Sequence, residues 1–379
     1  MDIICFCHLR WNFVYQRPQH LLSRFAQQHR VFVIEEPFFD AETAFLEDRV
    51  TTENVWIIIP HLPPGSSEEE NNSQQQLLLK EWCQRIEIKK YIAWFYTPMA
   101  LPLADVLPAP DLVIYDCMDE LSAFKNAHAS IKDKEALLLQ KADLVFTGGY
   151  SLYEAKKNLH HAIFPFPSSI DKKHFSKARS VSTVPFDHLD IPHPRIGFFG
   201  VIDERFNIEL LEKVALLKPE WHFVIIGPTV KIDPASLPVA SNIHYPGSRS
   251  YEDLPSYLAG WDVALIPFAL NESTRFISPT KTPEYLAGGV PVVSTSIRDV
   301  VNPYGENGLV YIADTPEDFV KGIEWGLSKK NDPVWLKTVD DFLEDISWDI
   351  TWLKMMMQIK TKLESKQLTN LKPNENEYV

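Results

Sequence analysis

Short apolar runs alternate with amphipathic stretches along most of the chain, the pattern of strands and helices in α/β proteins. In the first half, residues 17–28 predict an amphipathic helix with Leu21, Leu22 and Phe25 turned inward. The other predicted elements of this half are strands at 3–7, 31–34, 91–96, 112–115 and 144–147 and helices at 77–88 and 131–141. Such alternation favours a mostly parallel sheet with helices on both faces. Residues 60–76 are polar and predict a mobile surface insertion.

The pattern stops in a proline-containing polar stretch and restarts at Arg195. The second half predicts strands at 195–200, 223–226, 263–267, 290–294 and 309–312 and helices at 208–217, 250–258 and 317–327. We therefore predict an N-terminal Rossmann-like domain (1–178), a linker (179–194) and a C-terminal Rossmann-like domain (195–345). Residues 346–379 predict a C-terminal helix that crosses back to the first domain on a Trp and Met stripe, with a frayed tail from Asn370.

Length and charge narrow the class of protein. The 379 residues exceed one typical core and suit two domains. A net charge of −14 disfavours a general role on nucleic acid or on an anionic membrane. Because the N-terminus is acidic and no apolar run approaches the ~20 residues of a membrane span, we expect a cytoplasmic protein. Any membrane association would then be peripheral, at the inner face.

No metal site or disulfide is expected. The four cysteines, Cys5, Cys7, Cys83 and Cys117, lack C-x-x-C spacing and favour buried reduced thiols. Asp116 and Asp119 form only a loose carboxylate pair without clustered His or Cys ligands. We therefore predict neither a metal nor a cofactor.

Residues 278–294 carry the clearest candidate chemistry. Lys281 and Glu284 stand three residues apart at a predicted helix N-terminus, where free backbone amides attract anionic groups. Phosphate and ribose are natural ligands of such a place. The alternative is an ordinary loop, helix and strand unit with surface charges.

Ligands of open α/β sheets lie beyond the carboxyl ends of the strands, so we examined the residues that follow each predicted strand. Gly200 permits close backbone approach, and Arg205 offers a planar fork for a diphosphate unless it pairs with Glu204 or Glu209. In the first half Asp116 and Asp119 are candidates for holding sugar hydroxyls or acting as a base, or else they cap helices. His20 is a candidate for hydrogen bonding to a ligand or is a structural core histidine.

Taken in order, several segments resemble those of GT-B glycosyltransferases. The segments are 197–200, 224–228, 242–247, 251–258, 262–268 and 278–294. In the first half, residues 16–21, 143–147 and 166–171 look like bacterial surface-polysaccharide transferases of the teichuronic acid biosynthesis type. The resemblance covers nearly the whole chain and implies two Rossmann-like domains whose parallel sheets face each other across a cleft.

The resemblance also implies roles for individual residues. The C-terminal domain would hold a nucleotide-sugar donor through Gly200, Arg205, Pro279, Thr280, Lys281 and Glu284, with Glu284 on the ribose. The N-terminal domain would hold a glycan or lipid-linked acceptor through Arg17, Gln19, His20 and Asp116. Catalysis would use Arg205, Lys281 and Asp119 without a metal, because the cations stabilise the leaving nucleoside diphosphate.

One position departs from the family pattern. Retaining members often carry a second glutamate eight residues before the ribose-binding one, and here Phe276 occupies that position while Glu272 is out of register. The leading prediction is a retaining hexosyl-type transferase of surface-polysaccharide synthesis. The alternatives are a sugar-nucleotide 2-epimerase of the same fold and a catalytically silent carbohydrate-binding scaffold.

Overall fold

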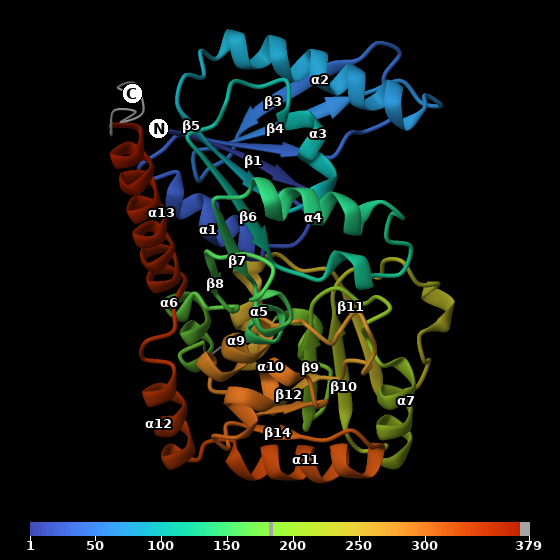
Figure 1. Ribbon diagram of the computed structural model, residues 1–379. Helices are drawn as coiled ribbons and strands as arrows, with labels where there is room; N and C mark the ends of the chain where they lie inside the picture. The colour runs from blue at the N-terminus through green and yellow to red at the C-terminus, as the bar shows by residue number, and fades with distance from the viewer. Residues whose placement is uncertain (182–184, 372–379) are drawn as a thin grey trace, which may run out of the picture.

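Two α/β units stack one above the other in the computed structural model, which describes residues 1–181 and 185–371 (Figure 1). The upper unit is built on an eight-stranded sheet and the lower unit on a six-stranded sheet. The chain therefore has the predicted GT-B architecture. Of the predicted linker and frayed tail, residues 182–184 and 372–379 lie outside the described residues.

The N-terminal sheet has the strand order β3-β4-β2-β1-β5-β6-β7-β8. Its strands are β1 (Asp2–Cys7), β2 (Val31–Glu35), β3 (Phe45–Val50), β4 (Val55–His61), β5 (Tyr91–Phe95), β6 (Leu112–Cys117), β7 (Leu144–Thr147) and β8 (Ile163–Pro165). Neighbouring strands are parallel except for the antiparallel pair β3 and β4. Its helices are α1 (Arg17–Phe25), α2 (Glu68–Arg85), α3 (Leu101–Ala104), α4 (Ile131–Lys141), α5 (Tyr150–Lys156) and α6 (Lys172–Phe175).

Two predictions for this half are corrected. The sequence analysis missed both strands of the β3–β4 hairpin: β3 is solvent-exposed and charged and so shows no buried face, whereas β4 is a largely buried apolar run that could have been detected. The predicted mobile insertion at 60–76 is wrong from Glu68 onward, where α2 has already begun. A capping box starts this helix: the Ser67 hydroxyl accepts from the Glu70 amide, and the Glu70 carboxylate accepts from the Ser67 amide. That Ser-x-x-Glu spacing was a readable signal.

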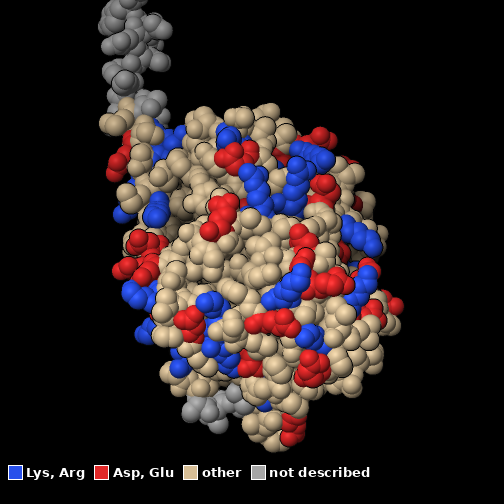
Figure 2. Space-filling view, turned by 90° about the horizontal axis from the view of Figure 1, so that it is seen from below, with Lys and Arg blue, Asp and Glu red and all other residues tan. Residues whose placement is uncertain are grey.

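The C-terminal sheet is parallel throughout its six strands, in the order β11-β10-β9-β12-β13-β14. The strands are β9 (Arg195–Phe199), β10 (His222–Ile226), β11 (Ile243–Gly247), β12 (Val263–Ile266), β13 (Val292–Ser294) and β14 (Val310–Ile312). The helices are α7 (Ile208–Leu217), α8 (Leu254–Ala259), α9 (Lys281–Ala287), α10 (Arg298–Val300), α11 (Pro316–Lys329) and α12 (Pro333–Phe342). Both signs of charge are interspersed on the face seen from below (Figure 2), so that face offers no extended basic surface.

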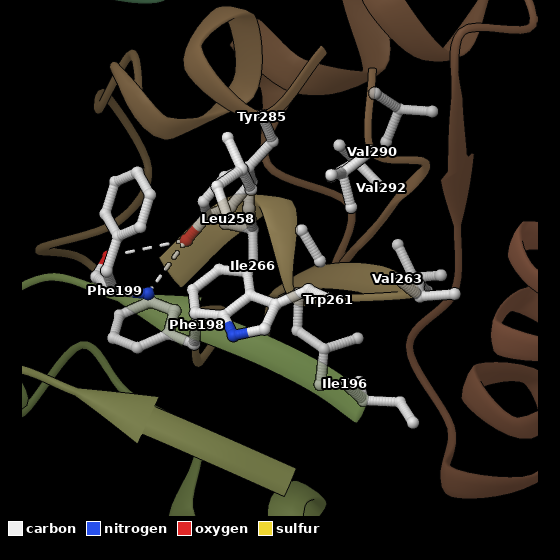
Figure 3. Close-up of a cluster of buried hydrophobic side chains, with 14 of the residues drawn as sticks. Ile196, Phe198, Phe199, Leu258, Trp261, Val263, Ile266, Tyr285, Val290 and Val292 are labelled. Carbon is white, nitrogen blue, oxygen red and sulfur yellow. Dashed lines mark hydrogen bonds between the residues drawn. The ribbon is translucent and has the colours of Figure 1, made fainter. Parts of the chain in front are cut away.

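The core of the C-terminal domain fixes α9 against the end of β9 (Figure 3). The Phe199 amide donates a hydrogen bond to the Tyr285 hydroxyl at 3.0 Å. Trp261 packs flat over Gly197, where a Cβ atom would lie 1.9 Å from the indole. Tyr285 and Trp261 are both almost completely buried. The start of α9 is therefore held at the carboxyl end of the sheet.

The helix α13 (Trp348–Leu371) follows α12 and runs along the side of the N-terminal domain (Figure 1). Its Trp348, Met355 and Ile359 are buried in one cluster with Leu21 and Phe25 of α1. The Trp348 ring stacks on His20 with centroids 4.7 Å apart. Trp348, Met355 and Met356 of the predicted stripe are thus core residues, whereas Met357 is exposed.

Replacing Trp348 by alanine should lower the free energy of unfolding by roughly 3–5 kcal/mol, because it empties a buried site between α1 and α13. Differential scanning calorimetry would measure this loss. Leu353→Ala is the matched control, since Leu353 lies on the same helix and is 53% exposed. Equal effects of the two changes would contradict a role of α13 in the N-terminal core.

Candidate active site

A cavity of about 760 Å³ lies between the two domains. The N-terminal domain lines it with residues 11–17, 49–53 and 118–119, and the C-terminal domain with loops after β9, β10, β11 and β12 and the start of α9. Most of these segments follow strand ends, where parallel sheets bind ligands. All six residues predicted to bind the donor line the cavity: Gly200, Arg205, Pro279, Thr280, Lys281 and Glu284.

Lys281 and Glu284 face this cavity from the first turn of α9. Glu284 is 5% exposed, and neither side chain has a hydrogen-bond or ion-pair partner within residues 1–181 and 185–371. Burial lowers the pKa of Lys281 and raises the pKa of Glu284, and the attraction between the two groups opposes both shifts. Buried charges without hydrogen bonds are costly, so a ligand that bonds to both groups would relieve the cost.

Gly200 makes room for the Lys281 side chain. A Cβ atom at Gly200 would lie 2.2 Å from Cε of Lys281 and 2.5 Å from its Nζ, and the backbone has φ +140°. At Gly227, also with positive φ, a Cβ atom would lie 1.9 Å from the Gly200 carbonyl oxygen. The two glycines bring the ends of β9 and β10 together below the lysine.

Arg205 is held by Asp203, a partner that sequence reasoning did not consider. The guanidinium donates from Nε to both Asp203 oxygens (3.0 and 3.1 Å) and from Nη2 to Oδ2 (2.7 Å). The expected alternative pairing with Glu204 or Glu209 is wrong. In the described part of the chain Nη1 has no hydrogen-bond partner, so one edge of the fork stays available to an anion.

Asp119 is the carboxylate that the N-terminal domain brings to the cavity beside these cations. Burial raises its pKa from the ordinary 3.8 to about 6, although Arg205 and Arg17 oppose the shift. Its side chain makes neither a hydrogen bond nor an ion pair with the described residues. A carboxyl group that titrates near neutrality suits proton transfer or a hydrogen bond to a hydroxyl group.

Three residues predicted to bind the acceptor lie inside the N-terminal domain and do not line the cavity. Asp116 is fully buried and accepts from Arg17 at 2.8 Å in an internal ion pair. Gln19 donates to the carbonyl oxygens of Trp11 and Val14. His20 is 2% exposed in its stack on Trp348.

We therefore withdraw Asp116, Gln19 and His20 as acceptor contacts, because their polar or ring groups are used in packing. Arg17 still reaches the cavity wall, although its guanidinium is bound to Asp116 and to the Phe166 carbonyl oxygen (2.7 Å). Arg17 therefore forms part of the cavity wall, and its charge is paired with Asp116.

Phe276 and Glu272 both lie outside this cavity and line a separate surface depression with Glu120, Lys156 and Leu159. The Phe276 side chain packs against the N-terminal core. Of this loop, Ile277 and Ser278 face the cavity instead. Neither residue 276 nor Glu272 therefore supplies a carboxylate to the cavity.

Sequence reasoning missed two parts of the cavity wall. The segment 49–53 reaches the cavity wall because β3 pairs with β4 in a hairpin. The exposed β3 has no apolar period in the sequence. Tyr251 lines the cavity, and its buried hydroxyl has no hydrogen-bond partner among the described residues. The sequence analysis placed Tyr251 in a predicted helix and did not predict β11, the strand that precedes it.

Other expectations concern metals, thiols and membranes. No group of three or more His, Cys, Asp or Glu side chains in the described ranges is arranged to hold a metal ion. Cys5, Cys7, Cys83 and Cys117 are buried free thiols, as predicted. Among the helices of the described chain, none is long and apolar enough to cross a membrane.

Comparisons with known proteins identify similar chains. Residues 193–329 match the family model of glycosyl transferases group 1. The putative teichuronic acid biosynthesis glycosyltransferase TuaH of Bacillus subtilis (strain 168) is 24% identical over 283 residues, which cover 69% of this chain and 70% of TuaH.

Two solved structures share the fold over nearly their full length. Sucrose-phosphate synthase from Thermosynechococcus elongatus has a TM-score of 0.68 at 12% identity, covering 96% of this chain and 100% of the other. HepE from Anabaena, in complex with UDP, has a TM-score of 0.66 at 11% identity, covering 95% and 100%.

The raised pKa of Asp119 predicts a pH-dependent cost. The folded protein keeps a proton that the unfolded chain releases between pH 3.8 and about 6, so this group lowers stability as pH rises through that window. Asp119→Asn should therefore be more stable than the wild type at pH 7, and the difference should vanish near pH 4.

Thermal unfolding of both proteins across this pH range would measure the difference. Asp190→Asn serves as the control, because Asp190 is exposed. A variant that is less stable than the wild type at pH 7 would show that the neighbouring cations outweigh burial.

Proposed function

Because this chain is a glycosyltransferase with the GT-B fold, we propose that it transfers a hexose-type sugar from a nucleoside diphosphate sugar to a glycan or lipid-linked acceptor. We propose further that it works in surface-polysaccharide synthesis, with retention at the anomeric carbon. The observation that carries the proposal is the pair of Lys281 and Glu284 at the wall of the interdomain cavity: Glu284 is buried, Lys281 is partly buried, and neither side chain has a hydrogen-bond or ion-pair partner among the described residues.

Each half of this pair suits one part of the donor. Glu284 accepts hydrogen bonds, as from the two hydroxyl groups of a ribose, and Lys281 carries a charge for the diphosphate. Arg205 adds a second cation with one free edge. The complex of HepE with UDP supports a uridine nucleotide as the first probe.

In the transfer, the bond between the anomeric carbon and the diphosphate oxygen breaks, and its electron pair goes to the leaving diphosphate. Lys281 and Arg205 stabilise the charge that builds there, which lowers the barrier. The acceptor hydroxyl oxygen forms the new bond to the anomeric carbon and loses its proton. Asp119 lies on the acceptor side and either takes that proton or holds a sugar hydroxyl. We propose that no metal or cofactor takes part.

Replacing Glu284 by alanine should weaken the binding of a nucleoside diphosphate by roughly 5- to 150-fold, since a hydrogen bond to a charged group contributes about 1–3 kcal/mol. Titration calorimetry with UDP, GDP, ADP and dTDP would measure this. Glu272→Ala is the control, because Glu272 lies outside the cavity.

If the wild type binds none of these nucleotides, the donor proposal fails. Incubating it with the matching nucleotide sugar alone then separates the functions. A transferase hydrolyses the donor slowly, a 2-epimerase converts it, and a silent scaffold leaves it unchanged. Anomer analysis of the transferred sugar by NMR tests retention.

Gly200→Ala should weaken binding of a nucleoside diphosphate and leave binding of the nucleoside unchanged, because the new methyl group displaces the Lys281 amine. Gly308→Ala controls for backbone strain, since Gly308 has φ +67° and an added Cβ would meet no atom within 4 Å. Calorimetry with UDP and uridine distinguishes the two effects. Equal losses of both ligands would place Lys281 away from the phosphates.

A further inference from the structure

A loop of the N-terminal domain contacts two cations that belong to the C-terminal domain. Phe124 follows β6 in this loop, residues 118–124. Its ring centroid lies 5.5 Å from Cζ of Arg205 and 5.4 Å from Nζ of Lys231. A cation within about 6 Å of an aromatic centroid is attracted by the ring quadrupole. One ring of the N-terminal domain thus contacts cations from two loops of the C-terminal domain.

The two cation-bearing loops form one unit. Arg205 lies in the loop after β9 and Lys231 in the loop after β10. The Ile202 amide donates to the Pro228 carbonyl oxygen at 2.9 Å, and the Val230 amide donates to the Ile202 carbonyl oxygen at 3.0 Å. The Ala269 amide donates to the Arg205 carbonyl oxygen at 2.7 Å. The backbone under both cations is therefore fixed.

The loop that carries Phe124 is fixed to the N-terminal domain in the same way. Glu120 accepts an ion pair from Lys156 of α5 at 2.8 Å, and the Lys156 side chain is 4% exposed. The Ser122 hydroxyl donates to Glu120 at 2.7 Å, and the Ala123 amide donates to the Glu120 carbonyl oxygen at 2.9 Å. Phe124 is thus presented by a rigid anchor rather than by a loose loop.

The side chains of the two cations are less constrained than their backbones. Lys231 is exposed and has no hydrogen-bond or ion-pair partner among the described residues. Arg205 is bound along one edge by Asp203 and keeps Nη1 free. Without the ring, the Lys231 amine would be free to move among many rotamers, and one restraint on Arg205 would be lost.

We propose that Phe124 is a positioning residue that holds Arg205 and Lys231 in place for the diphosphate of the donor. This inference rests on the proposed function and extends it to Lys231, which does not itself line the cavity but follows Gly227 and Pro228, which do. It also makes that site depend on the packing of the N-terminal domain. Donor binding and the approach of the acceptor domain are thereby linked through one side chain.

Phe124→Leu keeps an apolar side chain but removes the ring, and it should weaken UDP binding by about three- to tenfold. Uridine, which lacks phosphates, should bind equally well to both proteins. Phe124→Trp keeps a ring and should restore most of the UDP affinity. Titration calorimetry measures all three, and melting temperatures show that each variant is folded.

Phe38→Leu is the matched control, because Arg10 lies over the Phe38 ring at 3.8 Å and does not line the cavity, whereas Arg205 does. It should leave UDP binding unchanged. In the background of Arg205→Ala with Lys231→Ala, adding Phe124→Leu should have no further effect on UDP, since the ring acts through those cations.

Unchanged or tighter UDP binding by Phe124→Leu would overturn the proposal, as would an equal loss of uridine or a full additional loss in the double-variant background. If the wild type binds no nucleoside diphosphate of the panel, the donor function itself fails and the proposal fails with it. If the wild type binds UDP and Phe124→Leu binds it equally well, the positioning role alone fails.

Discussion

Desolvation of Lys281 and Glu284 is the constraint on which the arrangement of this protein depends. Glu284 is buried and Lys281 is partly buried at the start of α9, and neither side chain receives a hydrogen bond from the described residues, a state that costs free energy. Several features keep them there. Tyr285 ties α9 to β9, and Gly200 leaves space for the lysine. The fold thereby maintains two groups that lack hydrogen bonds, and the proposed donor would complete them through its ribose and diphosphate.

The N-terminal domain contributes groups of a different kind to the region of the cavity. Asp119 brings a carboxylate with a raised pKa, and Phe124 brings a ring to the cations. Because these groups come from one loop anchored by Glu120 and Lys156, the two domains are coupled at the point where the donor phosphates would lie. The geometry thus places the cations of the cavity in the C-terminal domain, and the carboxyl group and the ring that lie near them in the N-terminal domain.

Most of the buried parallel strands were predicted, because they are continuous apolar runs that periodicity detects, although β4 was missed despite such a run. The helices at 131–141 and 208–217 agree with α4 and α7 at both ends. The exposed β3 lacked any such signal, and its hairpin was missed. Among candidate site residues, Lys281 and Glu284 were found from local spacing. The ion pairs of Asp116 with Arg17 and of Arg205 with Asp203 could not be predicted, because sequence spacing does not show where these side chains point.

The position of α13 has a consequence for how the chain folds during synthesis. Trp348, Met355 and Ile359 complete the core around α1, which the ribosome makes more than 300 residues earlier. Until α13 is made, the nascent N-terminal domain therefore lacks the side chains that cover the apolar surface of α1, while the whole C-terminal domain is being translated. Such exposed surface invites aggregation and chaperone binding. The N-terminal domain is thus synthesised first, but its core is completed last.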